Sequence, residues 1–233
     1  LASRTGAFDI EKMQFSEEIL GTFGIDSTLF SKPMRAGSIV GSLKKEWGIS
    51  ATLVLGSHDQ VCAAVGAGVL RSGEAVDGMG TVECITTLFE TRPTVSDMGL
   101  QGYCCVPYAT EGLYCTYILN YSCGSSVNWF RRRITHEYRG DQENFFAYME
   151  ESMSDAPTGI LALPYLAGAG TPYQNLNAKG AFLNLTLNTR DADLYRALME
   201  GLTMEMRLNA ETVREYGIEI RELVATGGCS NSD

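Results

Sequence analysis

The chain has 233 residues, of which 45% are hydrophobic and 20% are charged, and its formal net charge is -10. This composition is typical of a globular protein with a sizeable core, and the acidic balance argues against a nucleic-acid partner. No apolar run approaches the roughly 20 residues of a membrane helix and no signal peptide is evident, so we expect a cytoplasmic protein without a membrane partner.

Cysteine and histidine usage points away from metal chemistry. The seven cysteines show no C-x-x-C pair, and the chain has only two histidines. Most of the cysteines sit within apolar runs, which favours buried, reduced thiols. We therefore expect no resident metal site built from these side chains.

The first fifty residues carry weak signals. Leu1–Thr5 reads as a segment that already lies inside a fold. The ranges Phe15–Leu20 and Ile39–Trp47 have apolar residues at three- and four-residue spacings, which predicts two short helices. The stretch Gly24–Gly37 between them is rich in turn residues.

An acid follows the first clear strand signal. The apolar run Ala51–Leu55 predicts a buried strand, and Gln60–Leu70 has the small and apolar residues of a helix. Asp59 then lies at the start of that helix, where the macrodipole favours an ionised carboxylate that can accept a proton. Taken alone, an aspartate in this position is most often only a helix cap.

A glycine-containing turn comes next. Glu74–Glu90 predicts two strands around Gly78–Gly80, because β-branched and apolar residues dominate its second half. The backbone N–H groups of this turn and the hydroxyl of Thr81 offer the chemistry that a phosphate oxygen needs. Strand alternation leaves open whether Glu83 faces away from that site or toward it, where it would repel an anion.

The remaining elements alternate between strands and helices. Cys123–Ser126 predicts a helix start capped by Ser125 or Ser126. Asp191–Tyr216 predicts the longest helix, capped by Thr189 and ended by Gly217. The other expected elements are the hairpin Tyr103–Pro107 with Leu113–Leu119, the helix Asn144–Met153, the strand Ile160–Leu166, and the strand Glu222–Thr226 that ends at Gly227–Gly228.

Four motifs occur in an order that carries a resemblance to a known family. They are Gly-Ser-His-Asp-Gln at 56–60, Gly80-Thr81, the stretch Gly180–Glu200, and Ala-Thr-Gly-Gly at 225–228. In this order the chain resembles the second half of the FGGY carbohydrate kinases, two-domain enzymes that share the actin, hexokinase and Hsp70 ATPase fold.

The resemblance implies an α/β chain with an actin-like, ribonuclease H-like fold. Residues 1–72 would be the end of the first domain, and residues 73–233 would be most of the nucleotide-binding second domain, cut off after the Gly227–Gly228 loop. Because the phosphate loop of the first domain is missing, we expect the isolated chain to be inactive.

The same resemblance implies ATP-dependent phosphorylation of a sugar or polyol hydroxyl, with ATP between the domains and Mg²⁺ bridging its phosphates. Asp59 would be the general base and, with His58, would contact the acceptor. The implied nucleotide contacts are Gly80, Thr81, Gly124, Asn128, Gly227, Gly228 and Ser232.

Two departures from the family pattern keep other functions open. Val82 and Glu83 replace the usual continuation of the Gly-Thr motif, and Asn184 replaces an expected glycine. A non-catalytic homologue that senses nucleotide or sugar is therefore an alternative, although the retained Asp59 argues against it. An ATPase acting on a protein partner is a third hypothesis, which the stretch Gly180–Glu200 disfavours. The acceptor sugar and a homodimeric state stay undetermined.

Overall fold

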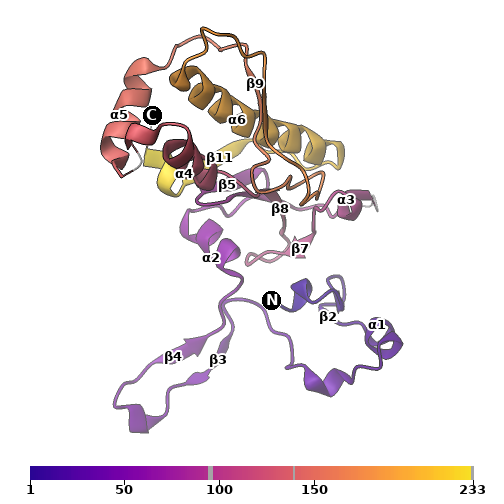
Figure 1. Ribbon diagram of the computed structural model, residues 1–233. Helices are drawn as coiled ribbons and strands as arrows, with labels where there is room; N and C mark the ends of the chain where they lie inside the picture. Colours follow the sequence, from indigo (N-terminus) through magenta and orange to yellow (C-terminus); the bar gives the residue numbers. More distant parts are fainter. Residues whose placement is uncertain (94–96, 139, 232–233) are drawn as a thin grey trace.

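The computed structural model describes residues 1–93, 97–138 and 140–231 (Figure 1). Its centre is a five-stranded sheet with the order β11-β5-β6-β8-β7, in which only the β11–β5 pair is parallel. These strands are β5 (Glu74–Met79), β6 (Glu83–Phe89), β7 (Val106–Pro107), β8 (Tyr114–Asn120) and β11 (Glu222–Thr226). The strand pair around the glycine turn, the hairpin and the last strand are thus confirmed.

Helices cover both faces of this sheet. In Figure 1, α2 lies below it, and α4, α5 and α6 lie above it. The helices are α1 (Glu17–Thr22), α2 (Asp59–Gly66), α3 (Asp97–Leu100), α4 (Gly124–Arg133), α5 (Gln142–Ser152) and α6 (Asp191–Glu215). A smaller antiparallel pair, β9 (Leu161–Leu163) with β10 (Ala181–Leu183), lies beside α6.

The two faces of the sheet are buried against different partners because successive strand residues point to opposite sides. On one face, Val76 packs in a cluster with Val61 of α2. On the other face, Ile85 packs in a cluster with Met206 of α6. A third cluster joins α4, α5 and α6 around Phe130. All three clusters draw on residues from 61 onward.

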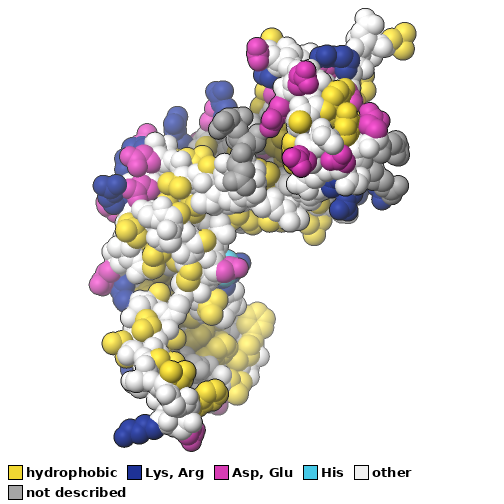
Figure 2. All heavy atoms as spheres, turned by 90° about the vertical axis from the view of Figure 1, so that its left-hand side faces the viewer, with side chains coloured by type: hydrophobic (Ala, Val, Ile, Leu, Met, Phe, Trp, Pro, Cys, Tyr) yellow, Lys and Arg dark blue, Asp and Glu magenta, His cyan; other side chains and the backbone are white. Residues whose placement is uncertain are grey.

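The first 55 residues add little to this core. They form the hairpins β1 (Phe8–Asp9) with β2 (Gln14–Phe15) and β3 (Ile39–Ser42) with β4 (Thr52–Val54), besides α1. Figure 2 shows hydrophobic side chains gathered over the lower part of the molecule, where Figure 1 has β3 and β4. In residues 1–55, the large apolar side chains that are more than two-thirds exposed are Leu1, Phe23, Leu29, Ile39 and Trp47.

The helix predicted over Ile39–Trp47 is wrong. Ile39–Ser42 is a strand that pairs with β4, and only Lys45–Trp47 forms a 3₁₀ turn. The β-branched Ile39 and Val40 fit a pleated strand, and the hydrogen-bonding partner β4 decides between the two conformations. The helix predicted over 60–70 is shorter than expected because Gly68 takes a left-handed φ of 81° just after it.

Two predicted helix caps are also wrong. Cys123, not Ser125 or Ser126, stands at the N-cap of α4, and it makes no side-chain cap bond. At α6, the side chain of Asp193 accepts the N–H of the N-cap residue Arg190 at 3.0 Å. Thr189 instead accepts the N–H of Thr186. Gly217 does end this helix, with a φ of 81°.

Candidate active site

The turn between β5 and β6 and the start of α4 form one hydrogen-bonded backbone unit. The N–H groups of Cys123 and Ser125 donate to the carbonyl of Thr81 at 3.2 and 3.1 Å, and Gly124 donates to the carbonyl of Gly80 at 2.9 Å. The first amides of α4 are therefore satisfied by backbone carbonyls, which explains why no side chain caps this helix. The positive end of the α4 dipole faces the turn.

Gly124 also has a steric reason to be glycine. A Cβ at this position would lie 2.7 Å from the carbonyl oxygen of Gly80, closer than side chains are found. The missing side chain lets two segments that are far apart in the sequence touch each other. Gly80, Thr81 and Gly124, all predicted nucleotide contacts, are thereby brought side by side.

Gly227 fixes the end of β11 against the same turn. Its φ is 96°, and a Cβ there would lie 2.5 Å from the carbonyl oxygen of Met79. The register of β11 places Thr226 opposite Gly78, so the chain leaves the sheet beside the turn. Gly227 therefore shapes the loop, and the adjacent Gly228 reaches the cavity described next.

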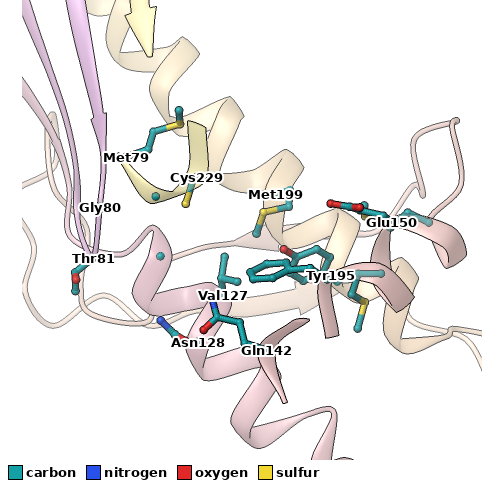
Figure 3. Close-up of a pocket in the computed structure, with 15 residues that line it drawn as sticks. Met79, Gly80, Thr81, Val127, Asn128, Gln142, Glu150, Tyr195, Met199 and Cys229 are labelled. Atoms are coloured by element: carbon teal, nitrogen blue, oxygen red, sulfur yellow. The ribbon is translucent and has the colours of Figure 1, made fainter. Parts of the chain in front are cut away.

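A cavity of about 690 Å³ opens between this turn, α4, α5, α6 and the segment after β11 (Figure 3). Five of the predicted nucleotide contacts line it: Gly80, Thr81, Gly124, Asn128 and Gly228. Gly227 lies next to it, and Ser232 lies outside the described residues. The Gly80-Thr81 motif and the Gly227–Gly228 loop thus meet at one place in the fold.

Sequence reasoning missed the wall of the cavity opposite the turn. This wall is largely apolar, and Figure 3 shows Val127, Gln142 and Tyr195 facing the same space from three helices. The residues of this wall come from α5, from Met153 just after α5, and from α6. They are Gln142, Phe146, Met149, Glu150, Met153, Tyr195 and Met199. Their three- and four-residue spacing marked buried helix faces, but nothing in that spacing distinguishes a cavity wall from a core.

Asn128 is oriented by a neighbour on its own helix. Its Oδ1 lies 3.4 Å from Nη2 of Arg131, whose Nη1 donates to the carbonyl of Tyr138 at 3.2 Å. Arg131 is only 6% exposed. A buried guanidinium that faces the amide oxygen leaves the amide NH₂ of Asn128 as the donor available to the cavity.

Asp59 is the first residue of α2, and its side chain is 93% exposed. Its Oδ1 accepts the N–H of Gln60 at 2.8 Å and lies 3.2 Å from Nε2 of His58. The side chain of Gln60 donates to the carbonyl of Cys84 at 3.3 Å, which ties the start of α2 to β6. A Cβ at Gly78 would lie 3.4 Å from that same Gln60 amide nitrogen.

The carboxylate of Asp59 therefore lies near the sheet end that carries the glycine turn, although it is not among the residues that line the cavity. It is reached from solvent, and the imidazole of His58 lies beside it.

Two buried acids lie behind the turn. Asp77 and Glu83 are each 6% exposed. Burial raises the pKa of Asp77 to about 6. Burial, and then the negative charge of Asp77, raise the pKa of Glu83 to about 7. The side chain of Glu83 therefore points into the protein interior. The sequence alone did not decide whether it faces toward the glycine turn or away from it.

Neither a membrane span nor a metal cluster is found in the described part of the chain. No helix in residues 1–93, 97–138 and 140–231 is both long and apolar enough to cross a bilayer. The same residues contain no group of three or more His, Cys, Asp or Glu side chains that could hold a metal ion.

Comparison with known proteins gives a consistent answer. Residues 79–233 match the family described as the FGGY family of carbohydrate kinases, C-terminal domain. A xylulose kinase from Staphylococcus epidermidis is 25% identical over 236 residues, which cover 99% of this chain and 46% of that kinase.

Solved structures show the same fold. A xyloylose kinase from Brucella ovis aligns with a TM-score of 0.86 at 23% identity, over 98% of this chain and 47% of that one. A Plasmodium falciparum glycerol kinase with ADP aligns with a TM-score of 0.83 at 22% identity, over 99% of this chain and 46% of that one. The expected fold class, an α/β actin-like ATPase fold, is confirmed.

The chain spans about half the length of the curated relatives it matches.

Proposed function

Because the chain belongs to the FGGY family of carbohydrate kinases, we propose that the protein containing it transfers the γ-phosphoryl group of ATP to a hydroxyl of a sugar or polyol. The observation that carries this proposal is that Gly80, Thr81, Gly124 and Gly228 line one and the same cavity. Phosphoryl transfer depends mainly on positioning and charge neutralisation, and a cavity built of glycine turns and a helix start suits that task.

In this proposal the cavity holds the nucleotide with its phosphates at the turn. The hydroxyl of Thr81 and the positive end of α4 favour the anionic phosphates. The apolar wall, including Met149 and Met199, takes the base, and the NH₂ of Asn128 lies between these two ends as a donor. Gly228 lets the backbone approach the adenosine closely.

Asp59 is proposed as the general base that accepts the proton of the attacking hydroxyl. Its exposed carboxylate can reach an acceptor bound from the solvent side, and His58 lies within 3.2 Å to orient it or to contact the acceptor. Mg²⁺, where present, would be held mainly by phosphates and water, as is usual for this ion, and Asp59 is the exposed carboxylate that could join them.

The domain division is part of the same proposal. Residues 1–72 would belong to the domain that carries the acceptor and the base, and residues 73–233 to the domain that carries the nucleotide. Closure of the two would exclude water, which otherwise competes with the acceptor for the γ-phosphate.

The experiment is phosphorylation of a panel of pentuloses, gluconate and polyols by the full-length protein, followed as ADP release. We expect at least one acceptor to accelerate release well above the rate without acceptor. Asp59→Ala should abolish that acceleration while ATP still binds, since the base is lost and the cavity is not. Asp155→Ala, which removes an exposed acid, is the matched control and should retain activity.

Near-normal turnover by Asp59→Ala would remove the base assignment. Failure of every acceptor to accelerate ADP release would remove the kinase proposal itself.

A further inference from the structure

The face of the sheet that packs against α6 changes character toward the glycine turn. Ala75 and Ile85 belong to the apolar cluster on this face. Asp77 and Glu83 stand two residues nearer the turn on β5 and β6, and alternation places them on the same face. Apolar residues would suit such a buried position at least as well, so the acids call for an explanation other than packing.

The surroundings of the two acids compensate for their burial only in part: the two carboxyls interact with each other, and Asn120 interacts with Glu83. Asn120 is the register partner of Glu83 on β8 and is also only 6% exposed. Asp77 Oδ1, Glu83 Oε2 and Asn120 Nδ2 are all buried atoms without a hydrogen-bond partner. Three orphaned polar atoms in one place are costly, and each is expected to have a reason to persist.

The titratable groups that face the pair are thiols. They are Cys123 before α4 and its neighbour Cys229 in the 3₁₀ turn Gly228–Asn231, whereas Cys84 on β6 points to the opposite face of the sheet. Burial raises the pKa of Cys84 to about 12. Burial and then the charge of Glu83 raise the pKa of Cys123. None of these groups is a cation, so a proton is the positive charge that can reduce the repulsion between the two carboxylates.

The pair also lies directly behind the cavity. Met79 lines the cavity and is the register partner of Glu83, so the two side chains leave the sheet on the same side. Figure 3 shows Met79 beside Gly80 at the end of β5. A change of charge on Asp77 or Glu83 therefore takes place under the turn to which we assign the phosphates.

We propose that Asp77 and Glu83 are positioning residues that share one proton behind the Gly80–Thr81 turn, and that this proton is needed for tight binding of nucleotide phosphates. This inference rests on the proposed function. With the proton, one carboxyl donates a hydrogen bond to the other and the pair carries one negative charge. Without it, two negative charges face each other and the phosphates, which loosens the turn and repels the ligand.

The burial of the two carboxyls determines whether ADP binding weakens or strengthens as the pH rises. Raised carboxyl pKa values mean that the pair holds its proton at slightly acidic pH and loses it as the pH rises above about 7. One extra unit charge about 10 Å from an anion, at an effective dielectric constant of about 20, weakens binding by about tenfold. The affinity for adenosine, which lacks phosphates, should fall much less over the same rise in pH.

The test uses this chain and measures ADP and adenosine binding by isothermal titration calorimetry at about pH 6 and about pH 8. The wild-type chain should bind ADP about tenfold more weakly at the higher pH. Binding enthalpies in two buffers of different ionisation enthalpy should show uptake of a proton when ADP binds at the higher pH. A purely structural acid pair would give no such uptake.

Asp77→Asn and Glu83→Gln are the informative variants, because each keeps a hydrogen bond across the pair and removes the second charge. We expect both to show a smaller difference in ADP affinity between the two pH values than the wild type, and less proton uptake, because the remaining carboxyl no longer meets a second charge. Any change from titration of ADP itself is shared by wild type and variants, so the difference between them reports the pair. Glu90→Gln, an exposed acid at the other end of β6, is the control and should behave as wild type.

Three outcomes contradict the proposal. ADP affinity of the wild type that is flat with pH overturns it while leaving the nucleotide site intact. Equal pH dependence in wild type and both variants assigns the effect to another group. Absence of ADP binding at every pH removes the nucleotide site and with it this inference. Should one variant fail to fold, the other variant and the wild-type proton uptake still decide the matter.

Discussion

Gly124→Ala is the substitution that tests the geometry of the cavity most sharply. The new Cβ would lie 2.7 Å from the carbonyl oxygen of Gly80, and that oxygen also accepts the N–H of residue 124 at 2.9 Å. The contact cannot be relieved without moving the oxygen away from its donor. Overpacking of this kind destabilises by about 1–3 kcal/mol, and a weakened buried hydrogen bond adds about 1 kcal/mol.

The same movement displaces the Gly80–Thr81 turn from α4, so ADP affinity should fall by more than about tenfold. Urea unfolding gives the stability change, and calorimetric titration with ADP gives the affinity. Gly66→Ala is the matched control, because a Cβ there meets nothing within 4 Å. It lies at the end of α2, where alanine should stabilise by roughly 0.5–1 kcal/mol and leave ADP binding unchanged.

ADP affinity within about twofold of wild type in Gly124→Ala would refute the reasoning, whatever its stability, since the turn would then not be needed in its present place.

Further predictions concern the end of β11 and the buried acids. Gly227→Ala should destabilise by about 2 kcal/mol or more in thermal unfolding, because φ is 96° and the Cβ would lie 2.5 Å from the carbonyl oxygen of Met79. Gly228→Ala should not destabilise the protein, because a Cβ at this position meets nothing within 4 Å. Stability of the wild type should fall as the pH rises from about 4 to about 7. The folded state binds protons at Asp77 and Glu83 that the unfolded state has released, so the stabilisation is lost as the pH passes their folded pKa values of about 6 and about 7. Removing either acid should reduce this slope, and an unchanged slope would show that other groups cause it.

Local signals in the sequence were enough for the central sheet and the longest helix. Leu198, Leu202 and Met206 repeat every four residues and are buried along α6. The β-branched run of β6 and the glycine turn before it likewise predicted a strand pair that the structure contains. In these elements the local pattern and the tertiary packing favour the same conformation.

Local sequence signals gave wrong predictions where the conformation of a segment depends on a partner far away in the sequence. Ile39–Ser42 became a strand because β4 pairs with it, and Cys123 needs no side-chain cap because the turn carbonyls of Gly80 and Thr81 already accept the first amides of α4. The wall of the cavity on α5 and α6 could not be separated from core by spacing. The burial of Glu83 required knowledge of its neighbours on β8 and α4.

The division of the chain at residue 72 and the roles of Asp59 and His58 remain predictions. They depend on how an acceptor approaches the exposed carboxylate of Asp59.

The central claim is that the cavity binds the phosphates of a nucleotide at the β5–β6 turn. A crystal structure of this chain grown with ADP tests it most directly. We predict phosphate oxygens within hydrogen-bonding reach of the Thr81 hydroxyl and close to the N-terminus of α4, and the base against Met149 and Met199. ADP bound on another face of the molecule, or bound in this cavity with its phosphates turned toward α5, would contradict the account.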